Sequence, residues 1–160
     1  MNRNSTEPGS PVGKWIWLRH VEGVYSIMDR LRAKHPALEI QSCSSGGGRI
    51  DLGILGRTDQ VWTSGNTDAL DHIRIQEGYS LVYPARCMES WVTHTHNHQT
   101  GRELPLSTRF DVAMRGALGI GASLNKLDDS VLADYASYIA IYDKCFISPV
   151  SRNGALRHLS

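Results

Sequence analysis

The sequence predicts an α/β fold built on parallel strands, and three observations support that prediction. Segments with apolar residues at helical spacing alternate with short apolar runs of the strand type. Each short run leads into a loop of small and polar residues. The order strand, loop, helix recurs about four times, and no long linker or low-complexity tract interrupts it. Such a pattern is typical of a single parallel α/β unit.

The first half of the chain contains two of these units. A helix is expected near 17–34, where apolar residues follow a period close to 3.6, and His35-Pro36 ends it. A strand near 37–42 then leads into a loop of serines and glycines. The second strand is expected near 60–64, and the second helix near 67–77. We expect Asn66 or Thr67 to cap that helix and Gly78 to end it.

The second half repeats the pattern. A third strand is expected near 87–93, and a helix near 106–115 follows Pro105, with Ser107 or Thr108 as its cap. A small fourth strand near 117–121 lies between glycines. The last helix, near 128–144, has its apolar residues on one face. The final residues carry little pattern and are expected to form a tail.

Composition narrows the class of protein. The 160 residues carry 17 Lys and Arg against 16 Asp and Glu, so the formal net charge is +1. This balance excludes a polybasic protein that binds nucleic acid or a membrane surface. No apolar stretch is long enough to span a bilayer, and the first residues do not resemble a secretory signal. An odd, widely spaced set of cysteines argues against a disulfide framework and favours a cytoplasmic location: Cys43, Cys87 and Cys145.

Three segments contain residues of the kinds that carry chemistry. The loop at 42–48 ends in three glycines, which either let the backbone approach a ligand closely or form a strained turn. In the same loop, Cys43 is either a reactive thiol or a small buried residue. The segment 62–68 follows a strand, where parallel α/β proteins place their chemistry, but its polar residues also suit helix capping. Alternate histidines could hold a transition metal or lie exposed in a loop: His94, His96 and His98.

Together these segments resemble the catalytic barrel of family 36 glycoside hydrolases, the bacterial α-galactosidases. Residues 41–51, Gln-Ser-Cys-Ser-Ser-Gly-Gly-Gly-Arg-Ile-Asp, resemble the family signature Glu-Ser-Cys-Ser-Gly-Gly-Gly-Gly-Arg-Phe-Asp. Residues 62–68, Trp-Thr-Ser-Gly-Asn-Thr-Asp, resemble Trp-Thr-Ser-Asp-Asn-Thr-Asp. Residues 1–7 resemble the sequence that follows the nucleophile in the family's Lys-Trp-Asp-Met-Asn-Arg motif. Further matches lie at 74–78, 83–84 and 97–102.

The resemblance implies a partial TIM barrel. The family fold is a (β/α)8 barrel between two β-domains, and residues 1–144 would supply its strands five to eight with their helices. Residues 145–160 would then lead towards a missing C-terminal β-domain. Because a half-barrel leaves two strand edges open and an apolar sheet face uncovered, we expect self-association or complementation by the missing half-barrel.

The resemblance also assigns site residues. A retaining glycosidase uses two carboxyl groups, a nucleophile and an acid/base. The nucleophile would lie one residue before Met1, and the acid/base position is Gly65, which has no carboxyl group. Asp68, three residues on in the first helical turn, is an unsuitable replacement. The galactose ring would be contacted by Asn2, Cys43, Ser44, Ser45 and Gly46, although Gln41 and Ser45 replace a family glutamate and glycine.

Three hypotheses about function follow. The first is an α-galactosidase that hydrolyses terminal α-galactosides of the raffinose or melibiose type with retention, in carbohydrate catabolism. The second is a truncated fragment without activity, which we favour for the isolated chain. The third is a half-barrel that binds a galactoside and is completed by another chain. None of them involves a cofactor, a metal, nucleic acid or a membrane.

Overall fold

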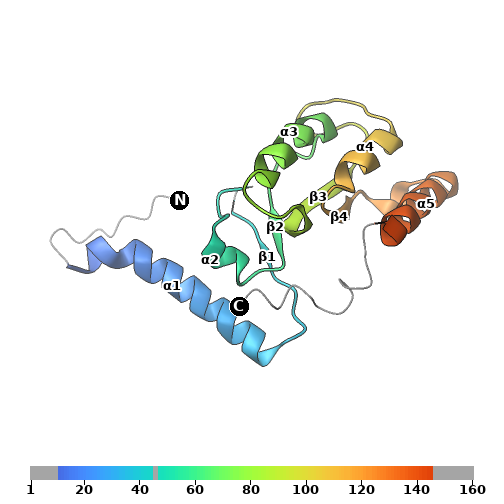
Figure 1. The fold of residues 1–160 in the computed structure, drawn as a ribbon. Helices are drawn as coiled ribbons and strands as arrows, with labels where there is room; N and C mark the ends of the chain where they lie inside the picture. Colours follow the sequence, from blue (N-terminus) through green and yellow to red (C-terminus); the bar gives the residue numbers. More distant parts are fainter. Residues whose placement is uncertain (1–10, 45–46, 146–160) are drawn as a thin grey trace. The chain divides into compact units, whose positions relative to one another are not determined.

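The computed structural model describes residues 11–44 and 47–145, which fall into two compact units on either side of residue 40 (Figure 1). Asn2, Ser45 and Gly46, which the sequence assigns to sugar binding, lie outside the described residues. So does nearly all of the expected tail. In the described part of the chain, no helix is long and apolar enough to cross a membrane.

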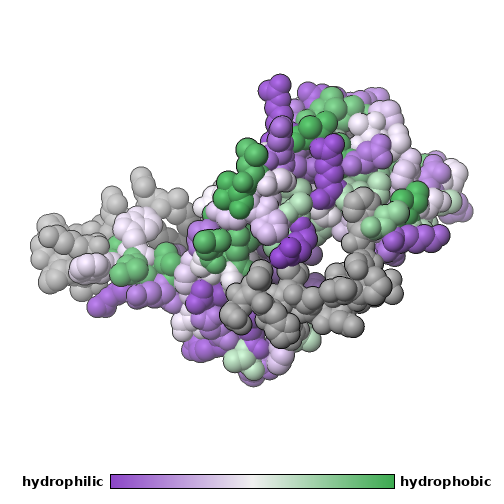
Figure 2. Space-filling model, in the orientation of Figure 1, coloured by the Kyte–Doolittle hydropathy of each residue, from purple (hydrophilic) through white to green (hydrophobic). Residues whose placement is uncertain are grey.

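The first unit is dominated by one long helix, α1 (Pro11–Lys34). It begins six residues earlier than the periodicity predicts, because proline suits the first helical turn. It ends before His35-Pro36 as expected, with Arg32 and Lys34 in the last turn, where basic residues favour the helix dipole. Several large apolar side chains are exposed along it: Trp15, Trp17, Leu18, Val21, Ile27 and Leu31. Green atoms mark hydrophobic residues at this surface in Figure 2.

The second unit contains a four-stranded parallel sheet in the order β1-β2-β3-β4. Its strands are β1 (Gln41–Ser42), β2 (Gln60–Trp62), β3 (Met88–Thr93) and β4 (Ala117–Gly121). The parallel fold class is therefore confirmed. The first strand is shorter than the predicted 37–42, because only its last two residues pair with β2. The ladder between β3 and β4 is the longest, with five paired positions.

The helices of the second unit include one that the sequence did not predict. α2 (Leu52–Leu55) is a single turn, capped by the Asp51 carboxylate, which accepts from the Ile54 amide at 3.0 Å. α4 (Leu106–Ala113) and α5 (Asp129–Cys145) lie within two residues of their predicted ends. Two short 3₁₀ turns, η1 (Ala85–Cys87) and η2 (Leu124–Lys126), precede β3 and α5.

Helix ends and caps were predicted less well. α3 (Ala69–Ser80) continues through Gly78, because the buried Tyr79 that follows packs against Val61 and Met88 and outweighs the low helix propensity of glycine. Its cap is Asp68 rather than Asn66 or Thr67. The residue before α4 is Pro105, which makes no side-chain cap, so the predicted caps Ser107 and Thr108 are wrong.

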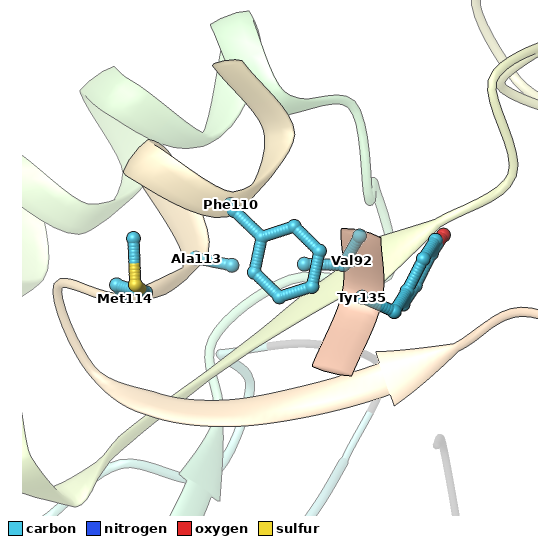
Figure 3. Packing of buried hydrophobic residues seen from close by; sticks show 5 residues of the cluster. All are labelled: Val92, Phe110, Ala113, Met114 and Tyr135. Atoms are coloured by element: carbon cyan, nitrogen blue, oxygen red, sulfur yellow. The ribbon is translucent and has the colours of Figure 1, made fainter. Parts of the chain in front are cut away.

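The core lies between the sheet and its helices. Phe110 of α4 is fully buried and packs in one cluster with Val92 of β3 and Tyr135 of α5 (Figure 3). Its ring stacks on Tyr138 at 4.6 Å and meets Tyr135 edge-on at 5.2 Å. The Tyr142 hydroxyl donates to the Gly116 carbonyl at 2.9 Å and so ties α5 to the start of β4. These contacts fix the strands whose ends carry the candidate site.

A second layer of polar contacts fixes α3 on the same face of the sheet. The Gln76 amide donates to the Ser90 hydroxyl at 2.7 Å and to the Val112 carbonyl at 3.1 Å. Side chains alternate along a strand, so Ser90 and Val92 point to the helices while Glu89 and Trp91 point to the opposite face. That face was expected to be apolar. It instead combines the Trp62 and Trp91 rings with the Glu89 carboxyl group.

Candidate functional site

The carboxyl ends of the four strands meet at one edge of the sheet. Because all pairs are parallel, the segments that follow Ser42, Trp62, Thr93 and Gly121 leave the sheet on the same side. The glycine loop lies against the end of β2, since a Cβ on Gly47 would stand 3.1 Å from the Thr63 carbonyl oxygen. The parallel order of the strands accounts for this shared edge.

The described ends of the glycine loop lie close together. A Cβ on Gly48 would lie 2.3 Å from the Ser44 carbonyl oxygen, so only glycine fits there. The Ser42 hydroxyl donates to the Arg49 carbonyl at 3.1 Å and closes the base of the loop. Within the loop, Cys43 is an exposed free thiol and Ser44 is half-buried. The alternative of a small buried residue at Cys43 is therefore wrong, and its side chain is accessible to a ligand.

Gly65, in the turn after β2, occupies open space. Nothing lies within 4 Å of the position a Cβ would take, and its φ is outside the left-handed region. Gly65 is also exposed. The local structure therefore does not require glycine, and the Cβ of an aspartate would meet no neighbour at this position.

Asp68 is fully engaged in holding the same turn. One carboxylate oxygen accepts from the Leu70 and Asp71 amides at 3.0 and 3.2 Å, as a helix cap does. The other accepts from the Thr100 hydroxyl at 2.7 Å, and Arg102 forms an ion pair with the group. Only 1% of the residue is exposed. Asp68 thus caps α3 instead of lying in its first turn.

The charge state of Asp68 follows from these contacts. Burial acts to raise its pKa, but the hydrogen bonds and the positive charge of Arg102 together hold that pKa below its ordinary value. A carboxyl group that stays ionised and is saturated with donors cannot act as a general acid. The prediction that Asp68 does not replace the missing acid is supported by this geometry.

The loop after β3 is tied to the turn after β2. The Asn97 amide donates to the Thr67 hydroxyl at 3.2 Å, and its oxygen accepts from the Gln99 and Thr100 amides at 2.9 and 3.1 Å. Gly101, with φ +67°, allows the loop to turn back so that Arg102 reaches Asp68. We call the residues of this connection the rim network: Asn66, Thr67, Asp68, Asp71, Asn97, Thr100 and Arg102. The sequence reasoning missed it.

The three histidines of this loop do not converge. The His94 ring accepts from the Ser123 amide at 3.1 Å and bridges the ends of β3 and β4. The His96 ring contacts the Glu103 carboxylate, and His98 is exposed. Among the described residues, no group of three His, Cys, Asp or Glu side chains is placed to hold a metal ion. These histidines are therefore loop residues.

The family model for melibiase matches residues 1–148. The chain belongs to the melibiase family. Two curated relatives of this melibiase-family chain are the α-galactosidases AgaA of Geobacillus stearothermophilus and Mel36A of Lactobacillus acidophilus. AgaA is 40% identical to it over 89% of this chain and 20% of AgaA. Mel36A is also 40% identical, over 88% of this chain and 19% of Mel36A. The chain therefore spans about a fifth of the length of these relatives.

Solved structures agree on the fold. The chain matches a doubly substituted variant of AgaA in complex with raffinose at a TM-score of 0.81 and 38% identity, over 88% of this chain and 19% of that one. It matches the α-galactosidase from Lactobacillus brevis at a TM-score of 0.82 and 37% identity, over 89% and 19% of the two chains. The resemblance to family 36 glycoside hydrolases is thus confirmed, and the parallel sheet of this melibiase-family chain is part of a barrel.

Proposed function

We propose that this melibiase-family chain forms part of a barrel that binds terminal α-galactosides of the raffinose and melibiose type, and that the chain does not hydrolyse them by itself. The observation that carries the proposal is Gly65. It lies at the sheet edge beside the glycine loop, in open space, at the position that the resemblance gives to the acid/base. A retaining mechanism needs two carboxyl groups about 5–5.5 Å apart on either side of the sugar.

Other carboxyl groups near Gly65 are already engaged. Asp68 is saturated by donors, and Asp71 accepts from the Asn66 amide at 2.7 Å and contacts Arg102. Both carboxylates are held by donors of the rim network, so neither is placed to give a proton to a leaving oxygen. Sugar binding does not need a free carboxyl group. The close approach of Gly48 to Ser44 and the exposure of Cys43 would let a sugar reach the backbone of these residues.

The complete reaction would require the strands that precede β1. By resemblance the nucleophile belongs to the strand next to β1, so a partner that supplies those strands would place it opposite position 65. We also propose a cytoplasmic location, since the cysteines are free thiols of the kind that a reducing compartment maintains.

The test combines this chain with the portion of AgaA that precedes the stretch aligned with this chain. We expect a chromogenic α-galactoside to be hydrolysed with retention when the chain carries Gly65→Asp. Acid assistance typically contributes about 10²–10⁴-fold. The matched control is Gly65→Asn, which has the same shape but cannot donate a proton. Hydrolysis by the unmodified chain alone, at an enzyme-like rate with contaminants excluded, would overturn the proposal.

A further inference from the structure

The sheet face opposite α3 and α4 carries an incompletely paired acid. Glu89 of β3 is 8% exposed, and one of its carboxylate oxygens accepts from the Trp91 indole. The other oxygen is buried and has no hydrogen-bond partner among the described residues. Burial raises the pKa of Glu89, and the bond from Trp91 acts in the opposite direction. A buried carboxylate with half of its acceptors unused is costly unless a donor reaches it.

Two tryptophans stand beside this acid. The Trp62 and Trp91 rings meet edge-on, with centroids 5.1 Å apart, and both side chains are half-buried. Glycines make room for Trp91 on the neighbouring strand, since a Cβ on Gly119 or Gly121 would lie 2.6 or 2.5 Å from the indole. A carboxylate beside half-buried aromatic rings is a suitable environment for a cation, which gains from both. We call Trp62, Glu89 and Trp91 the tryptophan face.

We propose that the tryptophan face is the docking surface for the polypeptide that supplies the preceding barrel strands, and that a lysine or arginine of that polypeptide pairs with Glu89. Charge complementarity argues for a basic side chain. Barrel geometry argues for a polypeptide, because the interior of an eight-stranded barrel is filled by side chains from facing strands. About four-fifths of the chain of each relative lies outside the part matched here, which is enough to supply such strands.

This inference rests on the proposed completion of the barrel, and its test measures binding rather than hydrolysis. The probe is the portion of Mel36A that precedes the stretch aligned with this chain, titrated with the full 160-residue chain at pH 7. We expect Glu89→Gln to weaken binding about 30-fold or more, because the probe's cation would be buried without its counter-charge. The matched control is Glu77→Gln, an exposed acid of α3 that should bind as the unmodified chain does.

A second variant distinguishes the loss of the Glu89 charge from misfolding of the chain. Glu89→Met keeps the volume and removes the charge, and it should bind as weakly as Glu89→Gln. Both variants should melt at or above the temperature of the unmodified chain, since each removes a buried charge. A large fall in melting temperature for both would show that Glu89 already has a partner in this chain and would overturn the inference.

The remaining outcomes separate the two proposals. Equal binding by the Glu89 variants and the unmodified chain would overturn the role of Glu89 but leave the completed barrel standing. Absence of binding by every variant would overturn both. Binding that depends on Glu89, without hydrolysis by the Gly65→Asp mixture, would support the docking surface and overturn the catalytic proposal.

Discussion

Replacing Asp68 by alanine removes the central acceptor of the rim network. In the unmodified chain the carboxylate receives the Leu70 and Asp71 amides and the Thr100 hydroxyl, and it forms an ion pair with Arg102. An alanine accepts none of these bonds. The first turn of α3 would lose its cap, and the loop after β3 would lose its strongest tie to the turn that holds Gly65.

The decrease in the free energy of unfolding follows from the contacts that Asp68 makes. Loss of an N-cap costs about 1–2 kcal/mol. The hydroxyl bond from Thr100 to a charged acceptor is worth roughly 1–1.5 kcal/mol here, near the low end for such bonds because Thr100 is exposed. Water screens the charge of Arg102 at the surface, so we assign its ion pair with Asp68 no contribution to the free energy of unfolding. We therefore expect Asp68→Ala to lower the free energy of unfolding by about 3 kcal/mol, and Asp68→Asn, which still caps, by about 1 kcal/mol.

Urea denaturation followed by tryptophan fluorescence measures this difference. The melting temperature of Asp68→Ala should fall by roughly 6–12 °C, on the scale expected for a chain of this size. The control is Asp111→Asn, an exposed acid of α4, which should change stability by less than about 0.5 kcal/mol. The assignment of Asp68 as the anchor of the rim network would be refuted if Asp68→Ala unfolded within that same margin of the unmodified chain.

Three further predictions concern the core, the glycines and pH. Phe110→Ala should cost about 3–5 kcal/mol in urea denaturation, because the ring is fully buried; a smaller loss would mean that the Tyr135 and Tyr138 packing collapses to fill the space. Gly119→Ala should lower stability by about 1–3 kcal/mol through its clash with Trp91, whereas Gly65→Ala should be neutral or stabilising by less than about 1 kcal/mol in thermal melts. Burial lowers the pKa of His72 below 6.5, so the unfolded chain binds more protons and stability should fall as pH drops below 6.5 towards the pKa of the folded state. The free energy of unfolding, measured by urea denaturation between pH 7.5 and 5, should show this decline with a slope of up to about 1.4 kcal/mol per pH unit. A His72→Gln variant with the same slope would contradict the assignment of the decline to His72.

Periodicity was sufficient for the layout of the sheet and its helices because hydrophobic spacing dominates such elements. The ends were harder to predict, since local propensity competes there with packing. Gly78 indicates the end of a helix, but Tyr79 is buried in the core and α3 continues through the glycine. The single turn α2 is too short to show a period, and only the capping role of Asp51 would have revealed it.

The site was predictable where it depends on chain order and not where it depends on long-range contacts. Parallel strands necessarily bring the glycine loop and Gly65 to one edge, so their neighbourhood followed from the strand order. The pairing of Asp68 with Thr100 and Arg102 joins residues more than thirty positions apart, and no local pattern indicates it. Glu89 was likewise read only as part of a strand, although an acid within an apolar run is a signal that could have been used.

The uneven ladders of the sheet have a consequence for how the molecule opens. β3 and β4 pair at five positions, and α4, the helix between them, brings the buried Phe110 against β3, whereas β1 and β2 pair at only two. Local opening proceeds in cooperative units whose free energies reflect buried contacts and paired backbone groups. Among the four strands, the amide protons of β3 and β4 should therefore exchange with solvent last, and those of β1 first. The strand beside the glycine loop would then be in frequent exchange between paired and open forms while the rest of the sheet stays closed.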